Sequence, residues 1–194
     1  MLDTLCAIGK ALDGGGILWA VGASLLLAQY GLADDPRDID ILVSLRDAEK
    51  AEKLLAALGQ TIPCEASGRY ATKHFRRFCV CGTDVDMLSG FTVVHEEGCY
   101  EYPFDGLSVP DFRWINGTRI PLAALEDWYV VYQLIPEKAG KATRIEVHFL
   151  EEGVKNPRLL ERALAQGLPE AVRGRVKALL RGGSSRAKGS ALKI

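Results

Sequence analysis

The stretch Asp38-Ile39-Asp40-Ile41 predicts the fold of this chain and the place of its chemistry. Acidic and apolar residues alternate in it, which is the pattern of a β-strand with one polar face and one buried face. We therefore expect the two acids on the same face, roughly 6–7 Å apart along the strand. Because an Asp-x-Asp pair alone is also common in surface loops, its neighbours in the sequence decide how it is interpreted.

Two further segments accompany this strand. Upstream, Gly22-Ala23-Ser24 follows the short apolar run 17–21 and leads into a predicted helix, so backbone N–H groups and the Ser24 hydroxyl can approach phosphates at a helix N-terminus. Downstream, Asp86 lies between two apolar residues in a second predicted strand. Divalent ions such as Mg²⁺ bridge phosphate oxygens in nucleotidyl transfer, and two or three acids on adjacent strands suffice to hold them. Together the segments predict a metal-assisted phosphate site.

This arrangement resembles the DNA polymerase β-like nucleotidyltransferase superfamily, and within it the small bacterial aminoglycoside nucleotidyltransferases and AbiEii-type toxins. The matching segments are 21–24, 37–41 and 85–87. The resemblance implies two Mg²⁺ ions held by Asp38, Asp40 and Asp86, or Asp86 as the general base for the acceptor hydroxyl. It implies that Gly22 and Ser24 hold the triphosphate of an NTP donor such as ATP. The acceptor would be RNA, a protein or a small molecule, and a toxin would have a cognate antitoxin as partner.

Some features depart from the family pattern. Ala23 stands where the family has a second glycine, which narrows the approach of a phosphate. The lysine found in the first C-terminal helix of the toxin-like members has no counterpart, because Tyr132 and Gln133 stand in that region. A non-catalytic module that keeps the fold and binds a protein or nucleic acid is therefore the alternative. Asp86 is preferred to Asp84 as the third acid, because its apolar neighbours indicate a strand interior.

The composition is that of an ordinary globular protein, with 194 residues, of which 48% are hydrophobic and 25% charged. Lys and Arg number 24 against 25 Asp and Glu, so the net charge of −1 favours no class of partner. The five cysteines show no disulfide or zinc spacing. No apolar run is long enough for a signal peptide or a membrane helix. These features predict a cytoplasmic protein without membrane contact.

The order of patterns predicts an α/β fold of the α+β kind. Residues 1–120 are expected to form the nucleotidyltransferase-like core, a mixed sheet flanked by helices, and residues 121–181 a helical C-terminal region. Residues 182–194 read as a basic flexible tail, because every charged residue after Glu170 is basic. Within the core, a hairpin is expected over 69–88 with its turn at Gly82-Thr83, and Asn116-Gly117 predicts a second tight turn.

Overall fold

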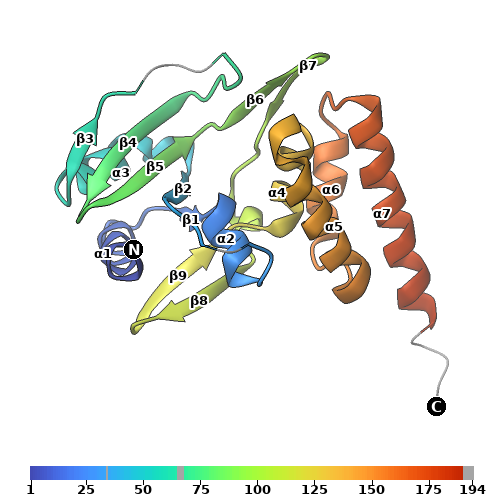
Figure 1. Ribbon diagram of the computed structural model, residues 1–194, viewed down its shortest axis with the longest axis horizontal. Helices are drawn as coiled ribbons and strands as arrows, with labels where there is room; N and C mark the ends of the chain where they lie inside the picture. Colours follow the sequence, from blue (N-terminus) through green and yellow to red (C-terminus); the bar gives the residue numbers. More distant parts are fainter. Residues whose placement is uncertain (34, 65–67, 190–194) are drawn as a thin grey trace.

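The computed structural model describes residues 1–33, 35–64 and 68–189, with side chains as far as residue 182. Its centre is a seven-stranded mixed sheet with the order β3-β4-β5-β2-β1-β9-β8, and β6 and β7 form a separate ribbon (Figure 1). The strands are β1 (Trp19–Val21), β2 (Ile39–Val43), β3 (Gln60–Ile62), β4 (His74–Val80), β5 (Thr83–Ser89), β6 (Thr92–His95), β7 (Gly98–Glu101), β8 (Asp111–Ile115) and β9 (Thr118–Leu122). This architecture confirms the predicted fold class.

The helices form two groups around the sheet. The first group is α1 (Leu2–Gly14) and α3 (Ala48–Ala56), which pack on one face of the sheet, and α2 (Ala23–Gln29), which links β1 to β2. The second group packs side by side at one side of the sheet (Figure 1) and consists of α4 (Leu125–Gln133), α5 (Ala139–Glu152), α6 (Pro157–Leu164) and α7 (Glu170–Gly189). Short 3₁₀ turns are η1 (Leu45–Asp47), η2 (Gly106–Ser108) and η3 (Pro136–Lys138).

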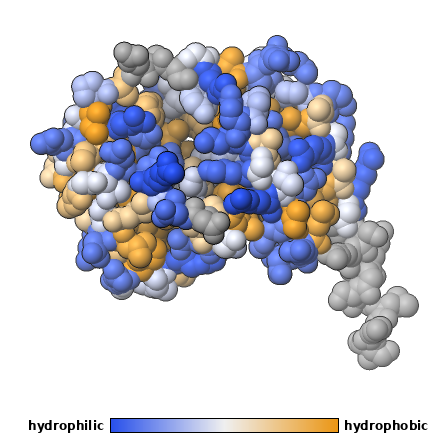
Figure 2. Space-filling view, in the orientation of Figure 1, coloured by the Kyte–Doolittle hydropathy of each residue, from blue (hydrophilic) through white to orange (hydrophobic). Residues whose placement is uncertain are grey.

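In the part of the chain that the structure describes, no helix combines the length and the apolar character that crossing a bilayer requires. On the face shown in Figure 2, apolar side chains are interspersed with hydrophilic ones rather than gathered over one element.

Alternation along β2 separates the core from a polar face, as the Asp-Ile-Asp-Ile pattern predicts. Ile39 and Ile41 are fully buried, whereas Asp40 is only partly buried. β2 pairs with β5 in parallel, and the register places Asp40 directly beside Asp86. β5 pairs with β4 in antiparallel, which places Arg77 beside Asp86. Charged residues from three neighbouring strands therefore share one face, opposite to the face that α1 and α3 cover.

Both predicted hairpins are present, and one turn differs from its prediction by one residue. Asn116 and Gly117 connect β8 to β9 with φ angles of +47° and +73°, as a type I′ turn requires. The β4–β5 turn is Cys81-Gly82, not Gly82-Thr83, because Thr83 is already paired with Val80 in the ladder. Cys81 and Gly82 also have positive φ angles, of 49° and 73°.

The C-terminal region is helical, as predicted. β9 ends at Leu122 and α4 begins at Leu125, close to the expected change of character at residue 121. The backbone of α7 continues to Gly189, so residues 182–189 of the predicted flexible tail are the last turns of a helix. The remainder of that tail, residues 190–194, lies outside the described residues. One continuous hydrophobic core joins the sheet to the C-terminal helices, which fixes the two parts against each other.

Candidate active site

The turn between β1 and α2 is tied to the sheet and to α4 through Gly22. Its N–H group donates a hydrogen bond to the carbonyl oxygen of Asp40 at 2.9 Å. A Cβ atom at this position would lie 2.3 Å from Cζ2 of Trp128, so only glycine lets the indole of α4 pack here. Gly22 therefore positions the turn against α4, and its N–H group is already occupied. In the predicted triphosphate site, Ser24 is the residue whose side chain reaches the cleft.

A lysine from the C-terminal helices contacts this turn. Nζ of Lys141, on α5, donates a hydrogen bond to Oγ of Ser24 at 2.6 Å. The same ammonium lies 5.3 Å from the centre of the Tyr132 ring. Burial lowers the pKa of Lys141, and the charge of Lys138 lowers it further, while the carboxylate of Asp40 opposes the shift.

The first C-terminal helix, α4, contains no lysine, as the sequence indicates, but the next helix supplies one that contacts Ser24. The lysine lies on the second C-terminal helix rather than the first, 117 residues from its partner Ser24 along the chain. The signal in the sequence was the pair of basic residues Lys138 and Lys141 directly after Pro136, where a new helix begins. Sequence spacing alone gave no reason to connect them with Ser24.

The three predicted acids line one cleft. Asp38 directly precedes β2, Asp40 lies within it, and Asp86 lies beside Asp40 on β5. Burial raises the pKa of Asp40 to about 7, and repulsion from the carboxylates of Asp38 and Asp86 adds to the rise. The charges of Lys141 and Lys138 oppose this rise only in part, so a bound cation would further stabilise the ionised form of Asp40. Asp84 is exposed and is not part of the cleft lining, which agrees with the preference for Asp86.

Asp86 differs from the other two acids because an arginine occupies both of its oxygens. Arg77 donates from Nε to Oδ1 at 2.8 Å and from Nη2 to Oδ2 at 3.0 Å, a bidentate pair. Among the described residues, no group of three or more His, Cys, Asp or Glu side chains is placed to hold a metal ion. All three acids line the cleft, and the third is hydrogen-bonded to Arg77.

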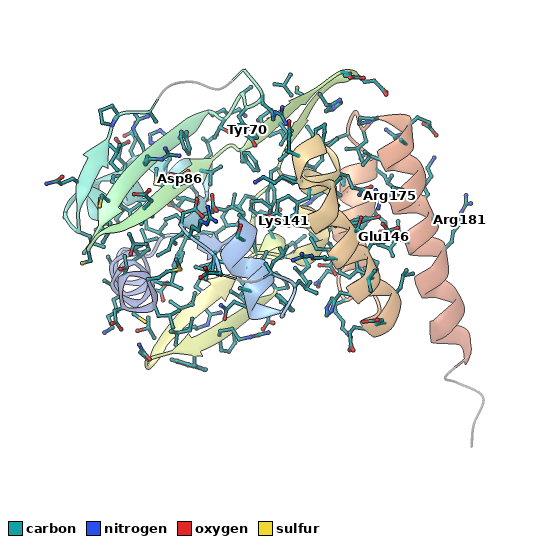
Figure 3. All side chains as sticks on the ribbon, in the orientation of Figure 1. Tyr70, Asp86, Lys141, Glu146, Arg175 and Arg181 are labelled. Atoms are coloured by element: carbon teal, nitrogen blue, oxygen red, sulfur yellow. The ribbon has the colours of Figure 1, made fainter. Side chains whose placement is uncertain are left out.

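The cleft has a volume of about 690 Å³, within the range of small-molecule and cofactor sites. It lies between the sheet and the C-terminal helices, and Figure 3 shows Asp86, Tyr70 and Lys141 around it from three parts of the chain. Its charged lining residues are the acids Asp38, Asp40 and Asp86 and the bases Lys73, Arg76, Arg77, Lys138 and Lys141. Three of the bases have carboxylate partners, namely Lys73 with Glu101, Arg76 with Glu52, and Arg77 with Asp86.

Aromatic side chains form one wall of the cleft. The ring centres of Trp128 and Tyr132 are 5.2 Å apart, and those of Trp128 and Phe91 are 6.1 Å apart. Tyr70 continues the wall, with its ring centre 5.8 Å from that of Phe91. Trp128 Nε1 and the Tyr132 hydroxyl are buried and have no hydrogen-bond partner in the described part of the chain. Such unpaired donors favour a ligand with acceptor atoms.

Comparisons with known proteins support the fold. No protein-family model matches the chain, and no curated protein matches it. A candidate nucleotidyltransferase from Thermotoga maritima superimposes with a TM-score of 0.56, at 22% identity over 75% of this chain and 89% of that one. The antibiotic-resistance factor ANT(2″)-Ia, in complex with adenylyl-2″-tobramycin, gives 0.55 at 12% identity, over 91% of this chain and 97% of that one.

A third similar structure is that of an antibiotic adenylyltransferase. The lincosamide antibiotic adenylyltransferase LnuA, with lincomycin bound, gives a TM-score of 0.50 at 12% identity, over 74% of this chain and 95% of that one. At such identities the similarity establishes the fold, and the chain has the nucleotidyltransferase fold that its motifs predict. These similarities give no support to the antitoxin or RNA partner expected from the sequence.

Proposed function

We propose that the protein transfers a nucleoside monophosphate from a nucleoside triphosphate to an acceptor, with a divalent metal ion held by Asp38 and Asp40. The observation that carries this proposal is the convergence of these two carboxylates with Ser24 and Lys141 in one cleft. The acids supply metal ligands, and the hydroxyl and ammonium groups supply donors for phosphate oxygens. The nucleotidyltransferase fold supports the same reading.

The residues present fit a hard cation such as Mg²⁺. Both proposed ligands are carboxylates, and Mg²⁺ commonly keeps water and substrate oxygens in its other positions, so two acids suffice. The raised pKa of Asp40 supports the fit, because it arises from burial beside other carboxylates that a cation would neutralise. A bound Mg²⁺ would offset charge on the phosphates during in-line displacement. Lys141 and Ser24 would orient the triphosphate beside it.

We propose a small molecule as the acceptor. The ANT(2″)-Ia structure holds an adenylylated aminoglycoside and the LnuA structure holds lincomycin, so small-molecule acceptors occur on this fold. In this chain the cleft is lined by five basic and three acidic side chains, but three of the bases are already paired with carboxylates. The charge of the lining is therefore close to balanced and does not select between neutral, anionic and cationic acceptors.

The test is transfer of label from α-labelled nucleoside triphosphates in the presence of Mg²⁺. Neutral, anionic and polycationic small molecules, RNA and protein are offered as separate acceptors. We expect Mg²⁺-dependent labelling that Asp40→Asn lowers by about 100-fold or more, as loss of a metal ligand does. Asp84→Asn is the matched control, because Asp84 is exposed and outside the cleft lining. Equal transfer by Asp40→Asn and wild type would contradict the proposal.

The alternative of a non-catalytic binding module loses its main support. It drew support from the absence of a lysine in the first C-terminal helix, whereas Lys141 of the second C-terminal helix contacts Ser24. Thermal unfolding with Mg²⁺ and a nucleoside triphosphate separates the two functions. A site that binds both ligands raises the melting temperature by mass action, whereas a module without the site leaves it unchanged.

A further inference from the structure

The Arg77–Asp86 pair gives this site a feature that the three-acid pattern does not predict. Both carboxylate oxygens of Asp86 accept hydrogen bonds from one guanidinium, at 2.8 and 3.0 Å. The two residues are direct cross-strand neighbours on β4 and β5, so the ladder itself holds them together. The Asp86 side chain is 14% exposed and that of Arg77 is 42% exposed. The carboxylate is thus enclosed, while the guanidinium reaches the cleft.

The position of this pair matters because Asp86 lies beside Asp40 in the sheet. In the two-metal site that the resemblance implies, Asp86 would be one of the metal ligands. Here a guanidinium already satisfies Asp86 in the fork geometry that carboxylates favour. Coordination of a metal by Asp86 would require breaking both hydrogen bonds and would place two like charges next to each other.

We propose that Arg77 is the fixed positive charge of this site and takes the place of a second metal ion. The protein then binds one divalent ion, at Asp38 and Asp40, and Asp86 is a positioning residue that holds Arg77. Nε and Nη2 are engaged with Asp86, which leaves Nη1 to donate to a phosphate oxygen in the cleft. This inference rests on the proposed nucleotidyl transfer and concerns the number and ligands of its cations.

Metal stoichiometry tests the proposal without depending on turnover. Mn²⁺ is titrated into the protein with a saturating non-hydrolysable triphosphate, α,β-methylene-ATP, and bound ions per complex are counted by electron paramagnetic resonance. We expect one ion in the wild type and in Asp86→Asn, and a loss of at least tenfold in Mn²⁺ affinity in Asp40→Asn. We expect two ions in Arg77→Met, because that change frees the carboxylate of Asp86 beside Asp40.

Arg113→Met is the matched control. Arg113 lies on β8 outside the cleft lining, and its Nη1 donates to Asp111. We expect one ion in this variant, as in the wild type.

Several outcomes would overturn the proposal. These are two ions in the wild type, loss of an ion in Asp86→Asn, or a single ion in folded Arg77→Met. If Arg77→Met does not fold, the number of bound Mn²⁺ ions and the Mn²⁺ affinity of Asp86→Asn and Asp40→Asn decide the question without it. Two ions combined with label transfer would contradict this inference and leave the proposed function intact. Absence of any Mn²⁺-dependent binding of the analogue would contradict the proposed function itself.

Discussion

Lys141 of α5 donates a hydrogen bond to Ser24 at the start of α2, with 2.6 Å between Nζ and Oγ. The contact connects the C-terminal helices to the turn that follows β1. The charge of Lys141 is also coupled to the carboxylates of Asp40 and Asp38. One ammonium group thus lies between the proposed phosphate side and the acidic side of the cleft.

Replacement of Lys141 by Met is expected to weaken binding of a Mg²⁺–triphosphate complex by about 10- to 100-fold, the worth of a charge-assisted hydrogen bond of about 1.5–3 kcal/mol. Isothermal titration with a non-hydrolysable analogue measures this. Lys53→Met is the control, because Lys53 is exposed on α3, against the other face of the sheet. Equal losses in the two variants would show that Lys141 has no specific part in binding.

The raised pKa of Asp40 predicts that the metal affinity of the site depends on pH. Its pKa of about 7 means that the carboxyl group must lose a proton before it can bind a cation. We therefore expect Mg²⁺ affinity to rise as the pH increases from about 6 to 8, with release of a proton on binding. Calorimetry in two buffers of different ionisation enthalpy measures that proton. Wild-type affinity that stays constant over this range would contradict the assignment of the raised pKa to Asp40.

The raised pKa of Asp40 also predicts how the free energy of unfolding of the metal-free protein depends on pH. The folded pKa of about 7 lies above the ordinary value of 3.8, so the native state binds more protons than the unfolded state between these values. The stabilising contribution of Asp40 is complete below the ordinary value and is lost as the pH rises through 7. Asp40→Asn has no titrating carboxyl group at this position, so the stability of this variant does not fall in this way. Urea unfolding in EDTA should show the variant gaining stability relative to wild type between about pH 4 and 7.

Ala23 has a φ angle of +48°, in the left-handed region that glycine favours. This conformation costs a non-glycine residue about 1–2 kcal/mol, more than the entropy that glycine adds to the unfolded chain. We expect Ala23→Gly to raise the free energy of unfolding by about 0.5–1 kcal/mol. Ala28→Gly, within the same helix, should lower it by about 1 kcal/mol. Destabilisation of similar size in both variants would show that the φ angle of Ala23 carries no strain.

Gly22→Ala should disrupt the contact between the turn and α4. The added Cβ would lie 2.3 Å from Cζ2 of Trp128, so the indole must move, and overpacking of this kind costs about 1–3 kcal/mol. Chemical unfolding measures the loss, and tryptophan fluorescence reports the displaced indole. Gly14→Ala is the control, because a Cβ there meets no atom within 4 Å. An unchanged emission spectrum in folded Gly22→Ala would rule out this packing role.

Local patterns of the sequence predicted much of the fold and part of the site. The alternation of acids and isoleucines around Asp40 places its carboxylate opposite the buried side of β2, because side chains of a strand alternate between faces. The Asn116-Gly117 pair predicted a turn whose positive φ angles suit those residues. Apolar neighbours marked Asp86, rather than Asp84, as the acid of the cleft. These features depend on residues close in the chain, so the sequence by itself determined them.

Tertiary structure decided which distant residues meet at those acids. Lys141 reaches Ser24 across 117 residues because the C-terminal helices pack against the turn after β1, and no short-range pattern encodes that packing. Gly22 is required by the indole of Trp128 from α4, a contact that only the docked helix creates. The ladder register opposes Arg77 to Asp86 and so occupies the third acid. Sequence determined where the acids lie, whereas packing and register determined which charges surround them.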